Sequence, residues 1–176
     1  MARVISLLTS EDFVKSISPI SDNLSGKYLL SAIREAQEIS LKSVIGTALL
    51  ERCKELIASG ELEQHEAYSE LVEQCQYYLA YTAIAECCMK VSFKVANAGV
   101  VRTTDEHLHD ASFSEVALIE KQYRNKADFY CHELQKWICA RYSDYPELSE
   151  CDCGRISANL RSFDGCGIFL GGARGK

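Results

Sequence analysis

Hydrophobic residues recur every three or four positions along most of this chain, and this spacing predicts amphipathic α-helices. Five segments show the pattern, covering about residues 9–17, 25–43, 47–59, 66–94 and 112–143. The chain has only two prolines, Pro19 and Pro146, which follow the first and the last of these segments. The pattern therefore predicts an all-α fold, a five-helix bundle.

Capping signals mark the starts of two segments. Thr9 followed by Asp12 predicts a capping box at the first helix, and Ser112 followed by Glu115 predicts another at the fifth. In such a box the first side chain accepts a hydrogen bond from the backbone amide of the fourth residue. The side chain of the acid accepts one from the backbone amide of the first residue. We expect both helices to begin at these residues.

Glycines mark the ends and bends. Gly46 predicts a break or a tight bend after the second segment, and Gly60 is a natural stop for the third. Between the two longest segments, Asn97 and Gly99 indicate a turn and Val100-Val101 a short extended run.

The fourth and fifth segments are the longest, and we expect them to pack antiparallel. Between Tyr77 and Met89 the fourth is apolar on nearly every side, which predicts burial all round. The fifth is roughly 45 Å long at 1.5 Å per residue. Alternating steps of three and four place one stripe of residues along it, which consists of Val116, Ile119, Tyr123, Ala127, Tyr130, Leu134, Trp137, Ile138 and Arg141.

The composition changes after residue 150, which divides the chain into a helical bundle (1–150) and an extended glycine-rich C-terminal arm (151–176). Six of the ten glycines lie in the arm. Full burial of its four large apolar side chains would contribute roughly 6–12 kcal/mol. Ordering 26 backbone units costs on the order of 26 kcal/mol or more. We therefore expect the arm to become ordered only against a partner; the alternative is a tail without a role. The expected partner-binding residues are Arg155, Arg161, Phe163, Ile168, Phe169, Leu170 and Arg174.

Charge is unevenly distributed over the 176 residues. The net charge is −6; residues 151–176 hold four basic and two acidic residues (+2), and the remainder holds 15 basic and 23 acidic (−8). An acidic body is unsuited to gripping phosphates and suits a surface along which DNA passes without specific binding. No apolar run reaches the roughly 18 residues of a membrane span. We expect synthesis in the cytosol and no contact with a membrane.

The nine cysteines do not form a secreted disulfide framework, because their number is odd and six lie in helical segments. Most are expected to be reduced, buried apolar residues. A zinc site at Cys151, Cys153 and Cys166, completed by His107 or His109, lacks the paired Cys-x-x-Cys spacing. The prediction is no cofactor, with a zinc-binding regulatory or interaction protein as the alternative.

The sequence signals for a catalytic site are weak. The acidic and histidine residues of 105–110 are typical of a polar turn before a helix. Cys131 and His132 are neighbours on a helix, so their side chains diverge by about 100° and cannot form a dyad. No phosphate-binding glycine loop is present. We expect a protein that is not an enzyme; a helical small-molecule binder is a further possibility.

Clustered aromatic residues of the fourth segment are a candidate nucleic-acid site. Tyr77, Tyr78, Tyr81 and Phe93 could stack on bases, but helical spacing within an apolar helix favours a place in the core or in a helix–helix interface.

The order of these segments resembles the head–tail connector (adaptor) proteins of tailed bacteriophages, in particular a small helical phage and prophage family of gut bacteria. The similarity covers about residues 7–148. It is carried by three stretches, Leu8-Thr9-Ser10-Glu11-Asp12-Phe13, Leu41-Lys42-Ser43-Val44-Ile45-Gly46-Thr47-Ala48-Leu49 and Asn97-Ala98-Gly99-Val100-Val101-Arg102.

The resemblance implies a virion protein at the head–tail interface. Its subunits would form a ring, twelve by resemblance, that sits on the portal protein, lines the DNA conduit and meets the next tail or connector protein. In such adaptors a C-terminal extension often fastens the subunit to the portal. The arm of this chain is assigned that role by its position.

Overall fold

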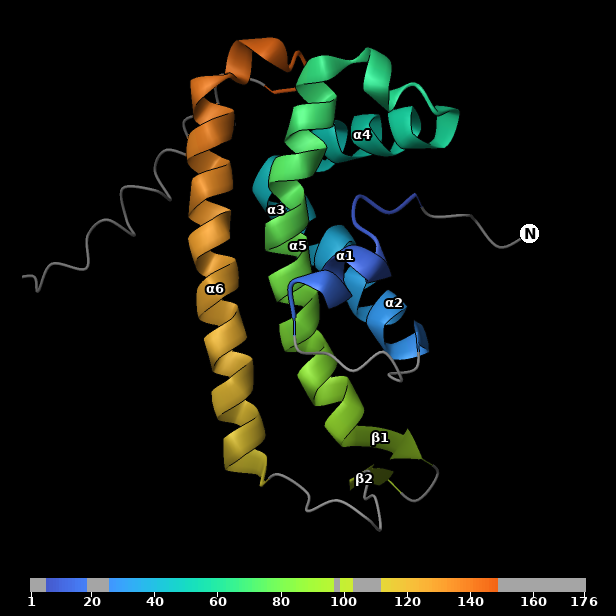
Figure 1. The fold of residues 1–176 in the computed structure, drawn as a ribbon, viewed down its shortest axis with the longest axis vertical. Helices are drawn as coiled ribbons and strands as arrows, with labels where there is room; N and C mark the ends of the chain where they lie inside the picture. The colour runs from blue at the N-terminus through green and yellow to red at the C-terminus, as the bar shows by residue number, and fades with distance from the viewer. Residues whose placement is uncertain (1–5, 19–25, 97–98, 103–111, 149–176) are drawn as a thin grey trace, which may run out of the picture.

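Two long antiparallel helices run the length of the molecule (Figure 1). They are α5 (Glu66–Ser92) and α6 (Phe113–Ala140). A short antiparallel hairpin, β1 (Phe93–Ala96) and β2 (Gly99–Arg102), follows α5, with Phe93 opposite Arg102 and Ala96 opposite Gly99. This computed structural model describes residues 6–18, 26–96, 99–102 and 112–148. The fold is all-α apart from this hairpin, and the extended run predicted at Val100-Val101 lies in β2.

The shorter helices pack against α5 and against one another. They are α1 (Glu11–Ser16), α2 (Gly26–Glu35), the π-helix η1 (Ala36–Leu41), α3 (Lys42–Ile45), α4 (Thr47–Ser59) and the 3-10 turns η2 (Leu62–Gln64) and η3 (Tyr142–Asp144). Figure 1 shows α1, α2 and α4 on the side of α5 away from α6. Helix α5 is thus the central element, and the five predicted helical segments are all present.

Local capping explains where the helices begin. Ser112 and Glu115 form the predicted capping box at the start of α6, with the Ser112 amide 2.7 Å from a Glu115 carboxylate oxygen. At α1 the prediction was wrong by one residue. Ser10, whose hydroxyl oxygen accepts from the Phe13 amide at 3.1 Å, caps the helix, while Thr9 is buried. A Ser-x-x-Phe sequence carries no acid to complete a box, so the pattern favoured the wrong cap.

Two glycines set the path of the chain around α4. Gly46 has φ +84° and ψ 165° between α3 and α4, and Gly60 has φ +73° and ψ 18° at the end of α4. Residues with a Cβ rarely adopt the first of these conformations. Both the predicted bend at Gly46 and the predicted stop at Gly60 are confirmed.

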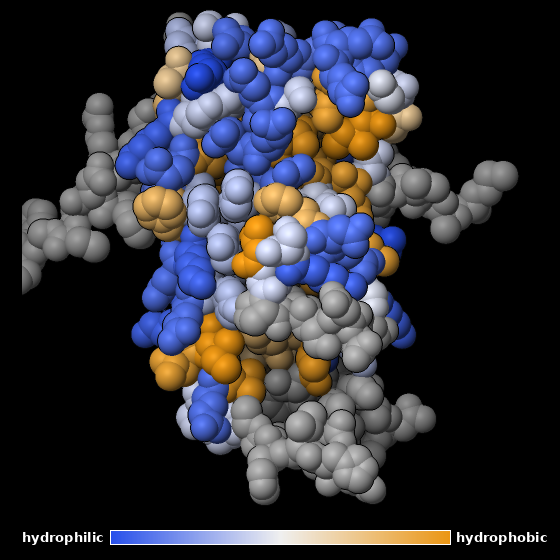
Figure 2. Space-filling model, in the orientation of Figure 1, coloured by the Kyte–Doolittle hydropathy of each residue, from blue (hydrophilic) through white to orange (hydrophobic). Residues whose placement is uncertain are grey.

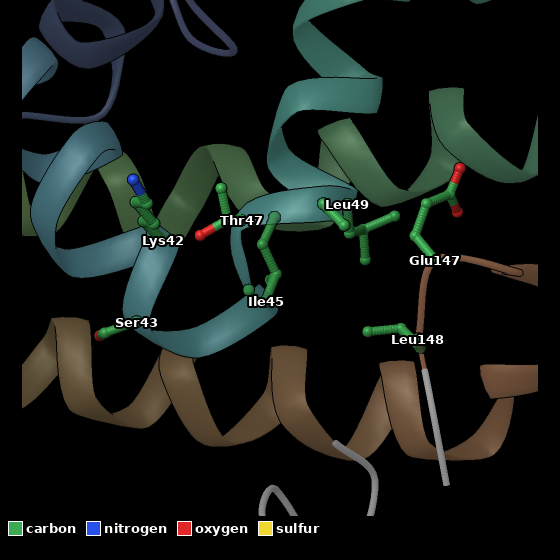
Figure 3. Close-up of a pocket in the computed structure, with 9 residues that line it drawn as sticks. Lys42, Ser43, Ile45, Thr47, Leu49, Glu147 and Leu148 are labelled. Atoms are coloured by element: carbon green, nitrogen blue, oxygen red, sulfur yellow. The ribbon is translucent and has the colours of Figure 1, made fainter. Parts of the chain in front are cut away.

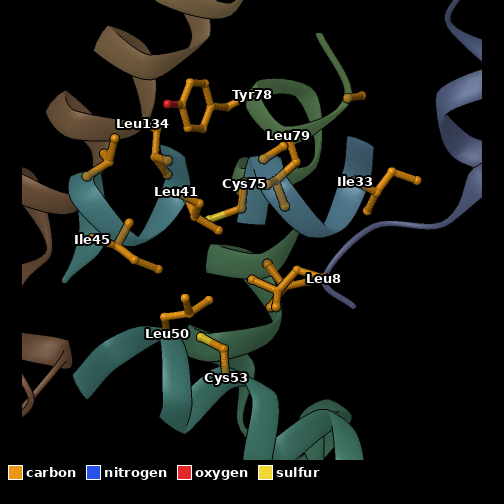
Figure 4. Close-up of a cluster of buried hydrophobic side chains, with 14 of the residues drawn as sticks. Leu8, Ile33, Leu41, Ile45, Leu50, Cys53, Cys75, Tyr78, Leu79 and Leu134 are labelled. Carbon is orange, nitrogen blue, oxygen red and sulfur yellow. The ribbon is translucent and has the colours of Figure 1, made fainter. Parts of the chain in front are cut away.

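The core lies where α2, η1, α3 and α4 meet α5 (Figure 4). Leu8 reaches it from the start of the chain and Leu134 from α6. Three cysteines, Cys53, Cys75 and Cys87, are buried there with free thiols, as expected for small apolar residues. A buried polar side chain, Gln37, ties the N-terminal segment down. Its Oε1 accepts from the Leu8 amide at 2.9 Å, and its Nε2 donates to the Ser6 carbonyl at 3.0 Å.

Burial of the long helices differs from the prediction at two places. Tyr77 on α5 is 42% exposed, although burial all round was expected there. Ile119, assigned to the buried stripe of α6, is 44% exposed, whereas Ala127, Leu134 and Ile138 are buried as predicted. The reason is that α6 packs on α5 and, to a smaller extent, on α3, so both helices keep an open side. No helix in the described ranges is long and apolar enough to cross a membrane.

Candidate functional site: the root of the C-terminal arm

Residues 142–148 connect the end of α6 to the C-terminal arm, and Tyr145 fixes them to the body. Its side chain is 1% exposed, and its hydroxyl donates to the Ala67 carbonyl at 2.8 Å. The ring meets Tyr68 edge-on, with centroids 5.6 Å apart, and lies 6.1 Å from Trp137. These contacts bury the turn after α6 against the first turn of α5.

Glu147 provides a second attachment two residues further on. Its carboxylate accepts from the Tyr68 hydroxyl, with oxygen–oxygen distances of 2.8 and 2.9 Å, and Arg52 Nε lies 4.0 Å away. Burial and the hydrogen bond with Glu147 raise the pKa of Tyr68 to about 12, so the phenol remains a donor at neutral pH. We call residues 145–148 the arm root, because they are the last described residues before the arm.

A hollow of about 330 Å³ separates the arm root from the bend between α3 and α4 (Figure 3). In Figure 3 the Leu148 side chain points across it toward Ile45. No side chain caps the first turn of α4 at this bend. The residues that line the hollow are Lys42, Ser43, Ile45, Gly46, Thr47, Ala48, Leu49, Glu147 and Leu148. The second stretch that carries the phage resemblance therefore faces the root of the arm.

Five aromatic side chains form a continuous row along the seam between α5 and α6. Phe13 meets Tyr77 edge-on at 5.4 Å between centroids, and Tyr77 stacks on Tyr130 at 5.2 Å. Tyr130 stacks on Tyr81 at 5.3 Å, and Tyr81 on Tyr123 at 6.4 Å. The row holds the two helices in register.

The expectation for the tyrosines of α5 is therefore confirmed. Tyr77 and Tyr81 lie in a helix–helix interface, and Tyr78 is buried in the core. The side chain of Phe93 lies outside the described part. Lys126 Nζ sits 5.0 Å and 5.5 Å from the ring centroids of Tyr123 and Tyr81, so a cation covers the rings that base stacking would need.

The outer face of α6 exposes large apolar side chains. Leu118 is 58% and Phe129 59% exposed, and they lie eleven residues, or about three turns, apart on one face. Phe113 and Ile119 are exposed at the start of the same helix. Figure 2 shows hydrophobic side chains gathered over this part of α6, at the lower left. Such patches on otherwise polar surfaces mark interaction sites.

One family model matches the chain. It describes a family of unknown function, DUF6712, and matches residues 41–158. The chain belongs to this family. The DUF6712 match includes α3 to α6, the hairpin and the arm root, and extends ten residues beyond the last described position. No curated protein and no solved structure matches the chain.

The arm residues predicted to bind a partner lie outside the described residues of this DUF6712 member. They are Arg155, Arg161, Phe163, Ile168, Phe169, Leu170 and Arg174. The zinc candidates Cys151, Cys153, Cys166, His107 and His109 and the acidic stretch 105–110 also lie outside. Within the described ranges, no three His, Cys, Asp or Glu side chains gather as a metal site would need.

Burial suppresses the nucleophilic reactivity of two cysteines, Cys131 and Cys53. Burial, with a smaller effect of the Asp128 carboxylate, raises the pKa of Cys131 to about 11. Burial, with a smaller effect of Glu147, raises the pKa of Cys53 to about 12. Thiols with such pKa values are protonated at neutral pH and are poor nucleophiles.

Sequence reasoning missed the arm root in this DUF6712 chain and did not identify the exposed residues on the outer face of α6. Tyr145 and Glu147 flank Pro146, and an aromatic residue and an acid so close to a helix end were the only available signal. Leu118 and Phe129 lie off the predicted buried stripe. Apolar residues on the polar side of a helix are the signal for a second contact surface.

Proposed function

We propose that this chain is a structural virion protein, a subunit of the head–tail connector ring of a tailed phage. The ring docks on the portal protein, lines the DNA conduit and contacts the next tail or connector protein. The arm at residues 151–176 fastens each subunit to the portal or to a neighbouring subunit. The phage assignment comes from the resemblance of three stretches, and the structure contributes the surfaces that such an assembly uses.

The observation that carries the proposal is the outer face of α6. A helix of 28 residues presents Leu118 and Phe129 to solvent on one line, while its other side packs on α5. Burying a large apolar side chain contributes roughly 1.5–3 kcal/mol. Lateral packing of copies, with α6 of each against its neighbour, would bury this line repeatedly around a ring.

The charge of the body suits a conduit for DNA. From residue 55 to residue 89 the chain holds seven acidic residues and no lysine or arginine. Five of the acids, Glu61, Glu63, Glu66, Glu70 and Glu73, are exposed around η2 and the start of α5. A surface of this charge repels phosphates, so DNA passes it without binding.

The arm root fixes the point on the body from which the proposed attachment to the portal starts. Tyr145 and Glu147 hold the start of the arm against α5, which limits the directions in which the arm can leave. Each arm binds weakly, because ordering its backbone costs more than its apolar side chains contribute, so contacts with the partner must supply the difference. Repetition around a ring converts weak contacts into a strong attachment.

The test is co-sedimentation with the cognate portal ring, followed by electron microscopy of the peak. The full chain is compared with a chain that ends at Glu150 and with a chain in which Ile168, Phe169 and Leu170 are replaced by serine. We expect an added ring of density with the full chain and none with either variant. Circular dichroism checks that the helical content of both variants is unchanged.

Each other result has a defined meaning. Binding by all three chains would keep the connector function and move the attachment from the arm to the body. Absence of binding by the full chain would refute the connector function. Zinc content of the full chain and of a Cys153→Ser variant would then be measured.

A further inference from the structure

A groove of about 710 Å³ lies at the end of α4 away from the arm root. Its apolar walls come from three sides of the molecule, with Leu7 from the N-terminal segment, Leu30 from α2, and Ile57 and Leu62 from α4 and η2. Figure 2 shows hydrophobic side chains gathered at the upper right, beside α4. Pockets of this size take ligands or short peptide segments.

A buried hydroxyl in the groove lacks a partner. Thr9 lines the groove and is 4% exposed, and its Oγ1 makes no hydrogen bond within the described residues. An unsatisfied buried polar group costs about 1–3 kcal/mol. The oxygen itself has almost no exposed surface, so a peptide backbone in the groove reaches it only after the Thr9 side chain rotates toward the groove.

The charges at the groove indicate which kind of occupant would match it. Asp12 and Glu11 line one end, and Glu61 and Glu63 flank the lining residue Leu62. Glu11 is partly engaged, because its carboxylate lies against Gly26 at the start of α2. Among the described residues that line the groove there is no lysine or arginine. An occupant with a short apolar run followed by basic residues would match this surface.

One segment of the chain has this composition. Ile168-Phe169-Leu170 is followed by Arg174 and Lys176, with only small residues between. We propose that the groove holds this segment of the same chain, with the three apolar residues against Leu30, Ile57 and Leu62 and the basic end beside Asp12. The inference rests on the proposed role of the arm and adds a second, competing place for it.

The connection is long enough for contact within one chain. Nineteen residues, 149–167, join Leu148 to Ile168 and span up to about 65 Å. Helix α4, which lies between the arm root and the groove, is about 20 Å long. A tether of this length gives the segment an effective concentration in the millimolar range, far above that of a second copy in dilute solution. A weak contact is therefore populated within the chain.

The consequence is a stored arm. Before assembly the apolar end of the arm is covered by its own body, and the portal displaces it by offering a larger surface. This arrangement would protect free subunits from premature association through Ile168, Phe169 and Leu170.

The test uses the full chain with Phe169 replaced by the photo-crosslinking amino acid benzoylphenylalanine. Irradiation of a dilute sample should give a product of monomer mass. Peptide mapping by mass spectrometry should place the crosslink at Leu30, Ile57 or Leu62. The same amino acid at Phe129, on the outer face of α6, is the control and should not reach these residues.

Two groove variants sharpen the test. Leu62→Glu and Leu30→Glu should each lower the crosslink yield by about ten-fold or more, because a carboxylate would face the apolar segment. Leu118→Glu, a matched change on α6, should leave the yield unchanged. Circular dichroism establishes that each variant is folded.

Three results would overturn the proposal. They are a crosslink elsewhere in the chain, a crosslink found only between two copies, and a yield that neither groove variant alters. Portal co-sedimentation separates the two hypotheses. A groove crosslink without portal binding refutes the connector function alone, and portal binding without a groove crosslink refutes the stored arm alone.

Discussion

Tyr145 shows how one side chain organises the end of the helical body. It is the only large aromatic residue among the most deeply buried side chains of the described part, and it reaches α5 through a hydrogen bond and an edge-on ring contact. Glu147 adds a charged acceptor for Tyr68 two residues later. Together they convert a turn after a helix into a fixed starting point for the arm.

Replacing Tyr145 by phenylalanine removes the hydrogen bond to the Ala67 carbonyl and keeps the ring. We expect the free energy of unfolding to fall by about 1 kcal/mol, because a part-buried hydrogen bond is lost. Urea denaturation followed by circular dichroism measures the change. Tyr142→Phe, in the exposed 3-10 turn, is the control and should stay within about 0.5 kcal/mol of the parent. Equal effects of the two changes would contradict the role given to Tyr145.

The buried cysteines lead to a prediction on pH. Burial raises the pKa of Cys53 to about 12 and that of Cys75 well above its ordinary value, so both thiols bind their protons more tightly in the folded state. Their contribution to stability is complete below the pKa of the unfolded thiol, about 9. It is lost as the pH rises from there through the folded values. Stability should therefore decline above about pH 9.

Alkylation with iodoacetamide at pH 8 checks the same two thiols directly. Cys53 and Cys75 should react at least about 100-fold more slowly in the folded protein than in urea, because the thiolate is the reactive form. Mass spectrometry identifies the modified residues. Rapid modification of Cys75 in the native protein would contradict its burial.

At the scale of elements, the bend between α3 and α4 decides where the arm root and its hollow lie. Gly46 takes a backbone conformation that is essentially restricted to glycine, and it places the start of α4 opposite Leu148. The Ser112–Glu115 capping box and the Gly60 stop act locally and could be found from sequence. The path of the bend also depends on the π-helix η1, which has no sequence signal of its own.

Alanine substitutions at the two glycines test this difference. A Cβ at either position meets nothing within 4 Å, so any cost comes from the backbone. Gly60→Ala should cost about 1 kcal/mol, since the left-handed helical region is accessible to residues with a Cβ. Gly46→Ala should cost about 2–3 kcal/mol, because its extended conformation at positive φ is not. Thermal or urea unfolding of the two variants gives the order, and the reverse order would contradict the assigned conformations.

At the scale of the whole molecule, the long helix pair has one covered and one open side. The short helices pack on α5, the aromatic row joins α5 to α6, and the outer face of α6 has no partner element within the described residues. In the proposed ring a neighbouring subunit would pack on this open face. The acidic residues between positions 55 and 89 lie on α4, η2 and α5.

The double variant Leu118→Glu with Phe129→Glu should prevent ring formation on the portal. Both side chains are exposed, so the free energy of unfolding should change by less than about 1 kcal/mol while lateral packing is lost. Electron microscopy of portal complexes and sedimentation velocity measure the assembly. Asn125→Asp adds a charge on the same face between the two positions and is the control. Complete rings formed by the double variant would remove α6 from the lateral interface.

The sequence by itself determined the helical segments and most of their ends. Hydrophobic spacing, Gly46, Gly60 and the Ser112–Glu115 box act within a few residues of themselves, so their effects can be recognised without the fold. The buried positions of α6 at Ala127, Leu134 and Ile138 followed from the same periodicity.

Only the tertiary structure decided which sides of the long helices stay open. Tyr77 and Ile119 have apolar side chains like those of buried residues, and their exposure depends on how far the short helices and α3 extend along α5 and α6. The contacts of Tyr145 with Ala67 and of Glu147 with Tyr68 join residues that are 78 and 79 positions apart. The groove at Thr9 is also built from segments far apart in the chain. Such contacts depend on packing in three dimensions, and periodicity along one helix carries no information about them.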